Sequence, residues 1–564
     1  AGGIVPGGPS QVPTGDSVPS DDESFPEDAF FVNFNVDADA EVYPFSANMR
    51  GVATNNWNWL GNGLMGPLQK QYSIIEATSY LRPGVIRFAG GLWANGVGWD
   101  REGIAPADGD WTYNDPDTGE EFDYTHTYSV AMVDSFADFA AKLGAEAIIQ
   151  VNICDNNPAM WADMLQYTNV EKNYGFEYWE LGNEQSLDSC GLDSQSYAER
   201  FALYMSALKP IDPTIKLLGP VTHNPAEIEW LDTLFDEVGN FLDVAAWHWY
   251  QLTEWTQNSS AYSYQGGSLE ALFAYDGAVG IGCHDGFGCA DRDDSIEDGR
   301  LSLWMNRRGV AEQMMEAINK RYRSSHPDLE TAITEFGAHA ADHELPINSN
   351  HVAAVWLADV LPRWAYNGLD IATYYSLEDG SAQGENSRGL LGIWDDAGTG
   401  VIDVRPIYYT MFMFAQYFGD MLVESSTNDA DQQAVAWAST DSHDEGSLKL
   451  MLVNMHGTPA VANINIENFS PVVGYAYTLE STDPLSMEDP ISYTRHNSTI
   501  NRIRIQDYDI NDSLSFLRSI AEIEADEVSV SERFIYTLPP YSVVALVLRD
   551  HDGPAPVASP AVLR

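Results

Sequence analysis

The stretch AEAIIQVNICDNNPAMWADMLQYTNVEKNYGFEYWELGN, residues 145–183, contains the unit from which most of the chain is built. Two runs rich in apolar residues, 145–153 and 175–183, flank a segment at 157–167 whose apolar residues recur with helical spacing. Apolar strands without regular polar alternation are typical of a parallel sheet that helices cover on both faces. The stretch therefore predicts a strand, a crossover helix and a second parallel strand, which indicates an α/β fold.

The same alternation continues on both sides of this unit, from about residue 48 to 376. Further strand-like runs lie at 49–54, 84–90, 215–221, 241–250, 330–337 and 369–377, and further helical segments lie at 72–81, 129–143, 195–208, 225–238, 307–323 and 352–366. Eight strands that alternate with helical segments in this way fit a (β/α)8 TIM barrel with insertions. The alternative, a doubly wound open sheet, usually carries a glycine-rich phosphate turn, and the sequence has none.

After residue 405, short strand-like runs separated by turn residues replace the helices, and they predict an antiparallel β-sandwich. The alternating segment at 30–45 has the same texture, so we expect it to join the sandwich. The predicted fold class is α/β, a (β/α)8 barrel with an accessory all-β sandwich domain. The predicted parts are a flexible leader at 1–25, N-terminal sandwich strands at 26–47, the catalytic barrel at 48–400, the sandwich at 401–552 and a tail at 553–564.

The chain has 564 residues and a formal net charge of −56. A polyanion gains no affinity by neutralising phosphates, so we expect neither nucleic acid nor an anionic membrane surface as a partner. No apolar run approaches the roughly 20 residues that a membrane-spanning helix needs. Hydrophobic residues make up 44% of the chain, which is enough for a large core. The composition indicates a soluble, acidic, multidomain globular protein.

The four cysteines are Cys154, Cys190, Cys283 and Cys289. Cys283 and Cys289 bracket a Gly-Phe-Gly loop that a disulfide would close, whereas Cys154 and Cys190 each follow a predicted strand and would also meet. Four thiols allow three pairings, and the sequence leaves them open. The Gly-, Pro- and Ser-rich leader is typical of what remains after signal-peptide removal. Together with the acidic surface it predicts a secreted, extracellular protein.

Catalytic side chains of such barrels project from the C-terminal ends of the strands. Glu184 and Glu335 stand out there, because each ends an apolar strand, where an acid is costly unless it faces a polar cavity. Cleavage of a glycosidic bond needs one acid to protonate the leaving oxygen and a second carboxylate as nucleophile or base. The complete set of polar residues at the predicted strand ends is Arg87, Asn152, Asn183, Glu184, His223, His248, Tyr250, Glu335 and Glu378.

Two of these strand ends carry motifs of a known family. YWELGNE, 178–184, resembles the fourth-strand motif of the clan A retaining glycoside hydrolases, and ITEFG, 333–337, resembles their seventh-strand motif. These enzymes are (β/α)8 barrels. The closing strands, TLPPYSVVALVL at 537–548, resemble the sandwich of the arabinofuranosidase, heparanase-like, xylosidase and endoglucanase branches.

The resemblance implies that Glu184 is the acid/base and Glu335 the nucleophile. With the two carboxyls about 5–5.5 Å apart, Glu335 would attack the anomeric carbon and the configuration would be retained. The negative neighbour and partial burial would keep Glu184 protonated before the reaction. We expect Asn183 to hydrogen-bond the sugar 2-hydroxyl and His248 or Tyr250 to orient the nucleophile. Arg87 matches the second-strand arginine that supports the nucleophile.

Further substrate-binding residues are expected near the strand ends. They are Asn152, Trp93 and Trp249, the tryptophans because aromatic faces pack against sugar rings. We expect no metal and no organic cofactor to take part in the chemistry. The segment HAADHE, 339–344, and the acidic loop at 291–299 offer metal-like spacings, but neither matches a complete zinc or calcium pattern.

Two features depart from the family pattern. Gln185 follows the Asn-Glu pair where many members have proline, which leaves the branch open. The insertion at 251–300, rich in Tyr, Gly and Asp, has no counterpart and is expected to form one wall of the cleft.

The sequence therefore predicts a secreted retaining glycoside hydrolase acting on plant or algal polysaccharides or oligosaccharides. Within this class the alternative is an exo-acting α-L-arabinofuranosidase or β-glycosidase, and from another class it is a non-catalytic carbohydrate-binding protein. The sugar, the linkage and the oligomeric state stay open.

Overall fold

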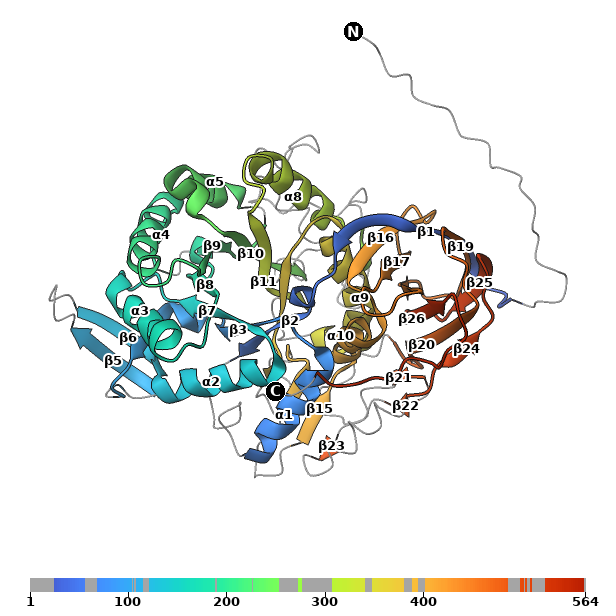
Figure 1. Ribbon diagram of the computed structural model, residues 1–564, viewed down its shortest axis with the longest axis horizontal. Coiled ribbons are helices and arrows are strands. Elements are labelled where there is room, and N and C mark those ends of the chain that lie inside the picture. The colour runs from blue at the N-terminus through green and yellow to red at the C-terminus, as the bar shows by residue number, and fades with distance from the viewer. Residues whose placement is uncertain are drawn as a thin grey trace, which may run out of the picture.

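The computed structural model contains a closed barrel of eight strands and a second, mostly antiparallel sheet beside it (Figure 1). The fold class predicted from the sequence is confirmed. The structure describes residues 25–55, 68–103, 105, 108–114, 121–187, 190–225, 227–252, 272–275, 307–339, 347–379, 388–393, 401–484, 498–501, 503–504, 508–509 and 523–561.

The barrel strands are joined in the order β10-β11-β12-β2-β3-β7-β8-β9, and every neighbouring pair is parallel. They coincide with the eight apolar runs of the sequence. The strands are β2 (Gly51–Asn55), β3 (Val85–Gly90), β7 (Glu146–Val151), β8 (Tyr178–Leu181), β9 (Lys216–Thr222), β10 (Val244–Leu252), β11 (Glu330–His339) and β12 (Ile371–Tyr375).

Helices surround the barrel, and Figure 1 shows α2 to α5 on its outer side. Local signals set several helix ends. Ser129 accepts a hydrogen bond from the Met132 amide at the start of α2, and Gly144, with a φ of 67°, ends that helix. The helices are α1 (Leu68–Leu81), α2 (Val130–Leu143), α3 (Pro158–Leu165), α4 (Ser194–Leu208), α5 (Ile228–Val238), α8 (Val310–Ile318), α9 (His351–Tyr366) and α10 (Pro406–Tyr417).

The barrel interior changes from apolar to polar along its strands. Val85 and Ile148 belong to a buried apolar cluster to which most of the barrel strands contribute. Arg87 and Gln150 follow them by two residues on β3 and β7, and both are fully buried. Because side chains alternate with a period of two, these polar residues share the interior face and lie one layer closer to the C-terminal ends. The sequence thus places a layer of buried polar side chains directly below the C-terminal mouth of the barrel.

The second sheet is built around the N-terminal strand β1 (Phe30–Pro44) and strands from the last third of the chain. β1 pairs antiparallel with β16 (Met421–Thr427) and parallel with β19 (Ala460–Glu467). Figure 1 shows this blue strand among orange and red ones. The other strands of the sheet are β17 (Ala434–Thr440), β18 (Ser447–Asn454), β20 (Val473–Ser481), β21 (Ser498–Ile500), β22 (Ile503–Arg504), β24 (Asp526–Val528), β25 (Arg533–Leu538) and β26 (Ser542–Arg549).

Helices α9 and α10 lie where the barrel meets this sheet. α9 contacts β1, β17, β18 and β26, and α10 packs against α1 and α9. α9 is buried along almost its whole length because it is covered from both sides. No helix among the described residues is long and apolar enough to cross a membrane.

Two small sheets complete the described chain. One follows β3 and has the order β4-β6-β5, and the other has the order β13-β14-β15-β23. Their strands are β4 (Val97–Asp100), β5 (Asp108–Asn114), β6 (Glu121–Ser129), β13 (Glu378–Asp379), β14 (Leu391–Ile393), β15 (Val401–Val404) and β23 (Tyr508–Asp509).

Candidate active site

The two glutamates singled out by the sequence meet at the C-terminal end of the barrel. Glu184 follows β8, and Glu335 lies on β11 beside His248 of β10. A carboxylate oxygen of Glu184, one of Glu335 and a ring nitrogen of His248 all lie within 4.8 Å of one another. Glu184 is 9% exposed and Glu335 is 5% exposed, so both acids are largely removed from water.

Arg87 lies at the centre of this group. Its guanidinium donates to Glu180 Oε2 at 2.7 Å, Glu335 Oε2 at 3.0 Å and Asn183 Oδ1 at 2.9 Å, and it lies 3.3 Å from His248 Nε2. Arg87 and Glu180 are fully buried. The guanidinium therefore holds Glu335 from inside the barrel, as the resemblance implied, and is not available as a surface ligand for a sugar.

Tyr250 and His248 contact different carboxylates. The Tyr250 hydroxyl donates to Glu335 Oε1 at 2.6 Å. His248 Nδ1 lies 2.7 Å from Glu184 Oε1 and 3.8 Å from Glu335 Oε2. The sequence left open which of the two orients Glu335. In the structure the close contact to Glu335 is made by Tyr250, whereas His248 bridges toward Glu184.

The surroundings of Glu335 favour its ionised form. Burial raises the pKa of this carboxyl, but the charges of His248 and Arg87, the Tyr250 hydrogen bond and the charge of Arg388 together bring it below the ordinary value. Burial and the neighbouring Glu335 charge raise the pKa of Tyr250 well above the usual value for a phenol. Tyr250 consequently remains a proton donor toward a carboxylate that is charged at neutral pH.

The backbone at Glu184 has an uncommon conformation. Its φ is 53°, in the left-handed region, and Gly182 two residues earlier has a φ of 96°. A left-handed residue with a side chain costs roughly 1–2 kcal/mol, so it persists only where its surroundings hold it. The Glu184 amide donates to the Val221 carbonyl at 2.9 Å, which fixes one end of this peptide. The turn aims the carboxyl at His248.

Asn183 and Asn152 have partners within the protein. Asn183 Oδ1 accepts from Arg87 and from Gln150 Nε2, the latter at 2.8 Å. Asn152 donates to the Val97 carbonyl at 3.0 Å and accepts from the Cys154 amide at 2.9 Å, and it is 2% exposed. The Asn152 amide supports the loop after β7, and the expectation that it binds substrate stays a prediction. The role expected for Asn183 stays a prediction.

Trp249 does not line the site. It is 1% exposed and packs against Trp356 and Trp364 of α9, with ring centroids 5.7 and 5.4 Å away. The expectation that it stacks on a sugar is therefore wrong: the alternation of β10 turns its ring outward, toward the helices, while His248 and Tyr250 face the mouth. Trp93 lies in a short turn at Leu92–Gly96, and its side chain is outside the described residues.

Tyr375 was not among the predicted site residues, and Arg388 was expected only as one of three arginines that could supply positive charge near the mouth. Tyr375 is the last residue of β12, and Arg388 lies over the rings of Tyr250 and Tyr375, 5.7 and 5.9 Å from their centroids. The reading of strand ends selected Glu378 instead, three residues beyond the observed end of β12. A stricter placement of that end would have identified Tyr375, whereas Arg388 carries no periodic signal in the sequence.

Cys154 and Cys190 form a disulfide, with their Cα atoms 5.7 Å apart. This resolves part of the pairing that the sequence left open. The other predicted features of the connecting segments fall largely outside the described residues: Cys283, Cys289, His343, Glu344, the acidic loop at 291–299 and most of the insertion at 251–300. His339 is described, and burial followed by the charge of Arg388 lowers its pKa to about 4.

Glu184, His248 and Glu335 are also the kind of donors that hold a metal ion. Arg87 already supplies a positive charge to Glu335, and a cation would have to compete with it. The arrangement is well suited to moving protons between two carboxylates, one held by Arg87 and Tyr250 and the other held by His248.

The chain resembles known glycoside hydrolases more clearly in structure than in sequence. A scan against protein-family models finds no match. Among curated proteins, the chain is 22% identical over 204 residues to an intracellular exo-α-(1→5)-L-arabinofuranosidase of Halalkalibacterium halodurans, a match that covers 31% of this chain and only 38% of that protein.

Solved structures resemble the chain over almost its whole length. An α-L-arabinofuranosidase from Thermotoga maritima, in complex with arabinose, superposes with a TM-score of 0.62 at 16% identity, covering 92% of this chain and all of that one. A family 44 xyloglucanase from Paenibacillus polymyxa gives a TM-score of 0.57 at 14% identity and covers 93% of this chain and all of that one. The chain has the fold of these glycoside hydrolases. At such low identity the likeness establishes the barrel-and-sandwich architecture and leaves the reaction to the site.

Proposed function

We propose that this protein is a retaining glycoside hydrolase that cleaves O-glycosidic bonds of plant or algal polysaccharides or their oligosaccharides. The observation that carries the proposal is the separation of Glu184 and Glu335, whose carboxylates approach within 4.8 Å. Retaining enzymes hold their carboxyls about 5–5.5 Å apart, whereas inverting enzymes need about 6.5–9.5 Å to admit a water.

Each step has a residue suited to it. Glu335, kept ionised by Arg87 and Tyr250, attacks the anomeric carbon and forms a glycosyl ester. Glu184 gives its proton to the departing glycosidic oxygen. It then takes a proton from water, whose oxygen attacks the same carbon and releases Glu335. Two inversions restore the original configuration.

The local balance of charge suits the first step. The Arg87 guanidinium bonds the carboxylates of Glu180 and Glu335, and Arg388 adds a second positive charge that acts on Glu335. These positive charges help to lower the pKa of Glu335 below its ordinary value, which suits it to attack as a carboxylate. Glu184 is joined to His248 at 2.7 Å and is the carboxyl to which we assign the proton transfer.

Within this class we infer that an α-L-arabinofuranoside is the first substrate to test. Both the curated relative and the Thermotoga maritima structure are described as arabinofuranosidases. The second substrate is a β-linked glucan backbone, because the Paenibacillus polymyxa structure is described as a xyloglucanase. A β-glycosidase or an endo-acting enzyme would be distinguished by chain-length analysis of the products.

The test is hydrolysis of chromogenic α-L-arabinofuranosides, β-glucosides and β-xylosides, together with arabinan and xyloglucan. NMR of the first product formed should show retained anomeric configuration. Inversion, or no hydrolysis of any member of the panel while sugars still bind, would contradict the proposal and would favour a non-catalytic carbohydrate-binding protein.

We also infer that the protein works in an oxidising, extracellular compartment. The Cys154–Cys190 disulfide supports this, because such bonds rarely persist in a reducing cytosol. Immunodetection in the extracellular and cell fractions of the source would test it, and recovery in the cytosolic fraction would contradict it.

A further inference from the structure

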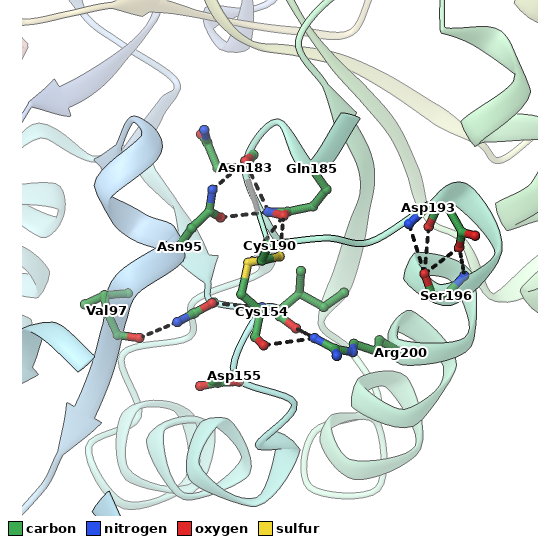
Figure 2. The surroundings of a disulfide bond; sticks show 12 residues. Asn95, Val97, Cys154, Asp155, Asn183, Gln185, Cys190, Asp193, Ser196 and Arg200 are labelled. Atoms are coloured by element: carbon green, nitrogen blue, oxygen red, sulfur yellow. Dashed lines mark hydrogen bonds between the residues drawn. A yellow bond between two sulfur atoms is a disulfide. The ribbon is translucent and has the colours of Figure 1, made fainter. Parts of the chain in front are cut away.

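We propose that Gln185, together with Asn95 and the Cys154–Cys190 disulfide, positions the acid/base Glu184 by fixing the peptide group that precedes it. This inference rests on the proposed function and adds positioning residues to it. Gln185 is the residue that departs from the family pattern, and its structural surroundings explain what a glutamine does there (Figure 2).

The peptide between Asn183 and Glu184 is held at both ends. Its N–H donates to the Val221 carbonyl at 2.9 Å. Its carbonyl oxygen, that of Asn183, accepts from Asn95 Nδ2 at 2.9 Å and from Gln185 Nε2 at 3.1 Å. Rotation of this peptide plane changes the φ of Glu184, which is 53°. The three hydrogen bonds therefore oppose relaxation of Glu184 out of its left-handed conformation, which would move the carboxyl away from His248.

The Gln185 side chain is itself fixed on three sides. Its Nε2 also donates to Asn95 Oδ1 at 2.7 Å, and the side chain is 1% exposed. A Cβ atom placed on Gly182 would lie 3.1 Å from this Nε2 and 3.2 Å from Gln185 Cγ, so the glycine leaves the space that the side chain uses. Gln185 Oε1 rests against the two disulfide sulfurs, 3.4 Å from Cys154 and 3.3 Å from Cys190.

The disulfide connects this contact to rigid parts of the barrel. Cys154 lies in the loop after β7, and Cys190 lies in the loop that leads into α4. The Cys154 carbonyl accepts from Arg200 of α4 at 2.9 Å, and its amide donates to Asn152. Figure 2 shows the disulfide between the Gln185 side chain and this anchored loop. The sulfurs thereby form a fixed wall behind the Gln185 amide.

The test uses Gln185→Met, which keeps the length of the side chain and removes its amide. Two glycosides of the sugar that the wild type cleaves are compared: a 2,4-dinitrophenyl glycoside, whose leaving group needs no proton, and an unactivated alkyl glycoside, whose leaving group does. We expect kcat/KM, which reports the first displacement, to fall about 10- to 100-fold for the alkyl glycoside and to change little for the dinitrophenyl one.

The matched control is Gln195→Met on the exposed side of α4, where the glutamine bonds only to Glu199 one turn away among the interactions described. It should leave both substrates unaffected. An equal loss on both substrates for Gln185→Met, or no loss, would overturn the proposal. If that variant does not fold, Asn95→Ala removes the other donor to the Asn183 carbonyl and replaces it in the test. We expect the same selective loss on the alkyl glycoside, and an equal loss on both substrates or no loss would again overturn the proposal.

The disulfide is tested by the double replacement Cys154→Ser and Cys190→Ser. We expect the same dependence on the leaving group, and we expect Gln185→Met to cost less in this background than in the wild type, because the two changes disturb one contact. Fully additive losses would overturn the role of the disulfide. Failure of the proposed function is distinguishable, since the wild type would then cleave neither glycoside.

Discussion

Two buried arginine–carboxylate networks in this molecule differ in how completely their carboxylate oxygens are hydrogen-bonded. In the barrel mouth, Arg87 meets the carboxylates of Glu180 and Glu335, and Glu180 Oε1 has no hydrogen-bond partner among the described residues. Between barrel and sandwich, both oxygens of Asp359 are saturated. They accept from Arg308, from Arg363 at 2.8 and 3.1 Å and from Trp437 Nε1 at 3.1 Å.

The difference distinguishes a candidate catalytic site from a structural contact between two domains, the Asp359 network, which we call the joint. The Asp359 network is balanced in charge, because Glu312 also accepts from Arg363, at 2.8 Å. Trp437 links this network from β17 of the sandwich to α9 of the barrel. Its charges lower the pKa of Asp359 against the effect of burial. The Arg87 network has more carboxylates than cations and opens on Glu184 and Glu335. An incompletely satisfied buried group is tolerated where chemistry uses it.

The largest expected effect comes from Glu335→Gln. We expect kcat to fall at least about 10³-fold, because the nucleophile is lost, while the melting temperature stays near that of the wild type. Steady-state assays and thermal unfolding measure the two quantities. Glu330→Gln, at the opposite end of the same strand β11, is the control and should retain activity. Equal activity of Glu335→Gln and the wild type would contradict the assignment of Glu335 as the nucleophile.

Asp359→Ala should have the reverse profile. Removing Asp359 leaves the buried Arg308 without its carboxylate and leaves Arg363 with Glu312 alone. We therefore expect a loss of about 3–5 kcal/mol in the free energy of unfolding and unchanged kcat in the fraction that remains folded. Denaturant titration measures this. Asp138→Ala, which removes an exposed pair with Lys142, should cost less than about 1 kcal/mol.

The contribution of Asp359 should depend on pH in a defined direction. Its pKa in the folded state lies below the value of about 3.9 of an unfolded aspartate, so its stabilisation is present above that value and is lost as the pH falls through the folded pKa. The stability difference between wild type and Asp359→Asn should therefore be largest near neutral pH and narrow in acid below about pH 4. A difference that widens in acid would contradict this assignment.

The smallest effect is expected from Tyr250→Phe. The Tyr250 hydroxyl helps to lower the pKa of Glu335, so its removal should raise that pKa and move the acidic limb of the kcat/KM profile to higher pH. The matched control is Tyr275→Phe, which removes a 2.7 Å hydrogen bond to Glu312 near the joint and should leave the limb in place. A shift of the limb toward lower pH in Tyr250→Phe would contradict the assignment.

The sequence predicted the parts of the molecule that depend on local periodicity. All eight barrel strands and seven helices were placed correctly, since apolar runs and helical spacing report which residues are covered. The helix α10 (Pro406–Tyr417) was not predicted, because the sequence was expected to enter the sandwich there. Glu184 and Glu335 were found because a carboxyl at the end of an apolar strand is informative by itself. Trp249 was misassigned for the complementary reason. Position near a strand end does not say whether a side chain faces the mouth, a neighbouring loop or the helices.

By itself, then, the amino-acid order determined the repeating strand–helix architecture, the sheet of the second domain and the two acids at one rim. Only the tertiary structure decided which groups touch them: that Tyr250 bonds Glu335 while His248 bonds Glu184, that Cys154 pairs with Cys190, and that Arg388 joins the site from a distant loop. The physical reason is that periodicity is a property of neighbours in the chain. Contacts across a closed barrel join residues far apart in sequence, and they are set by register, loop path and packing.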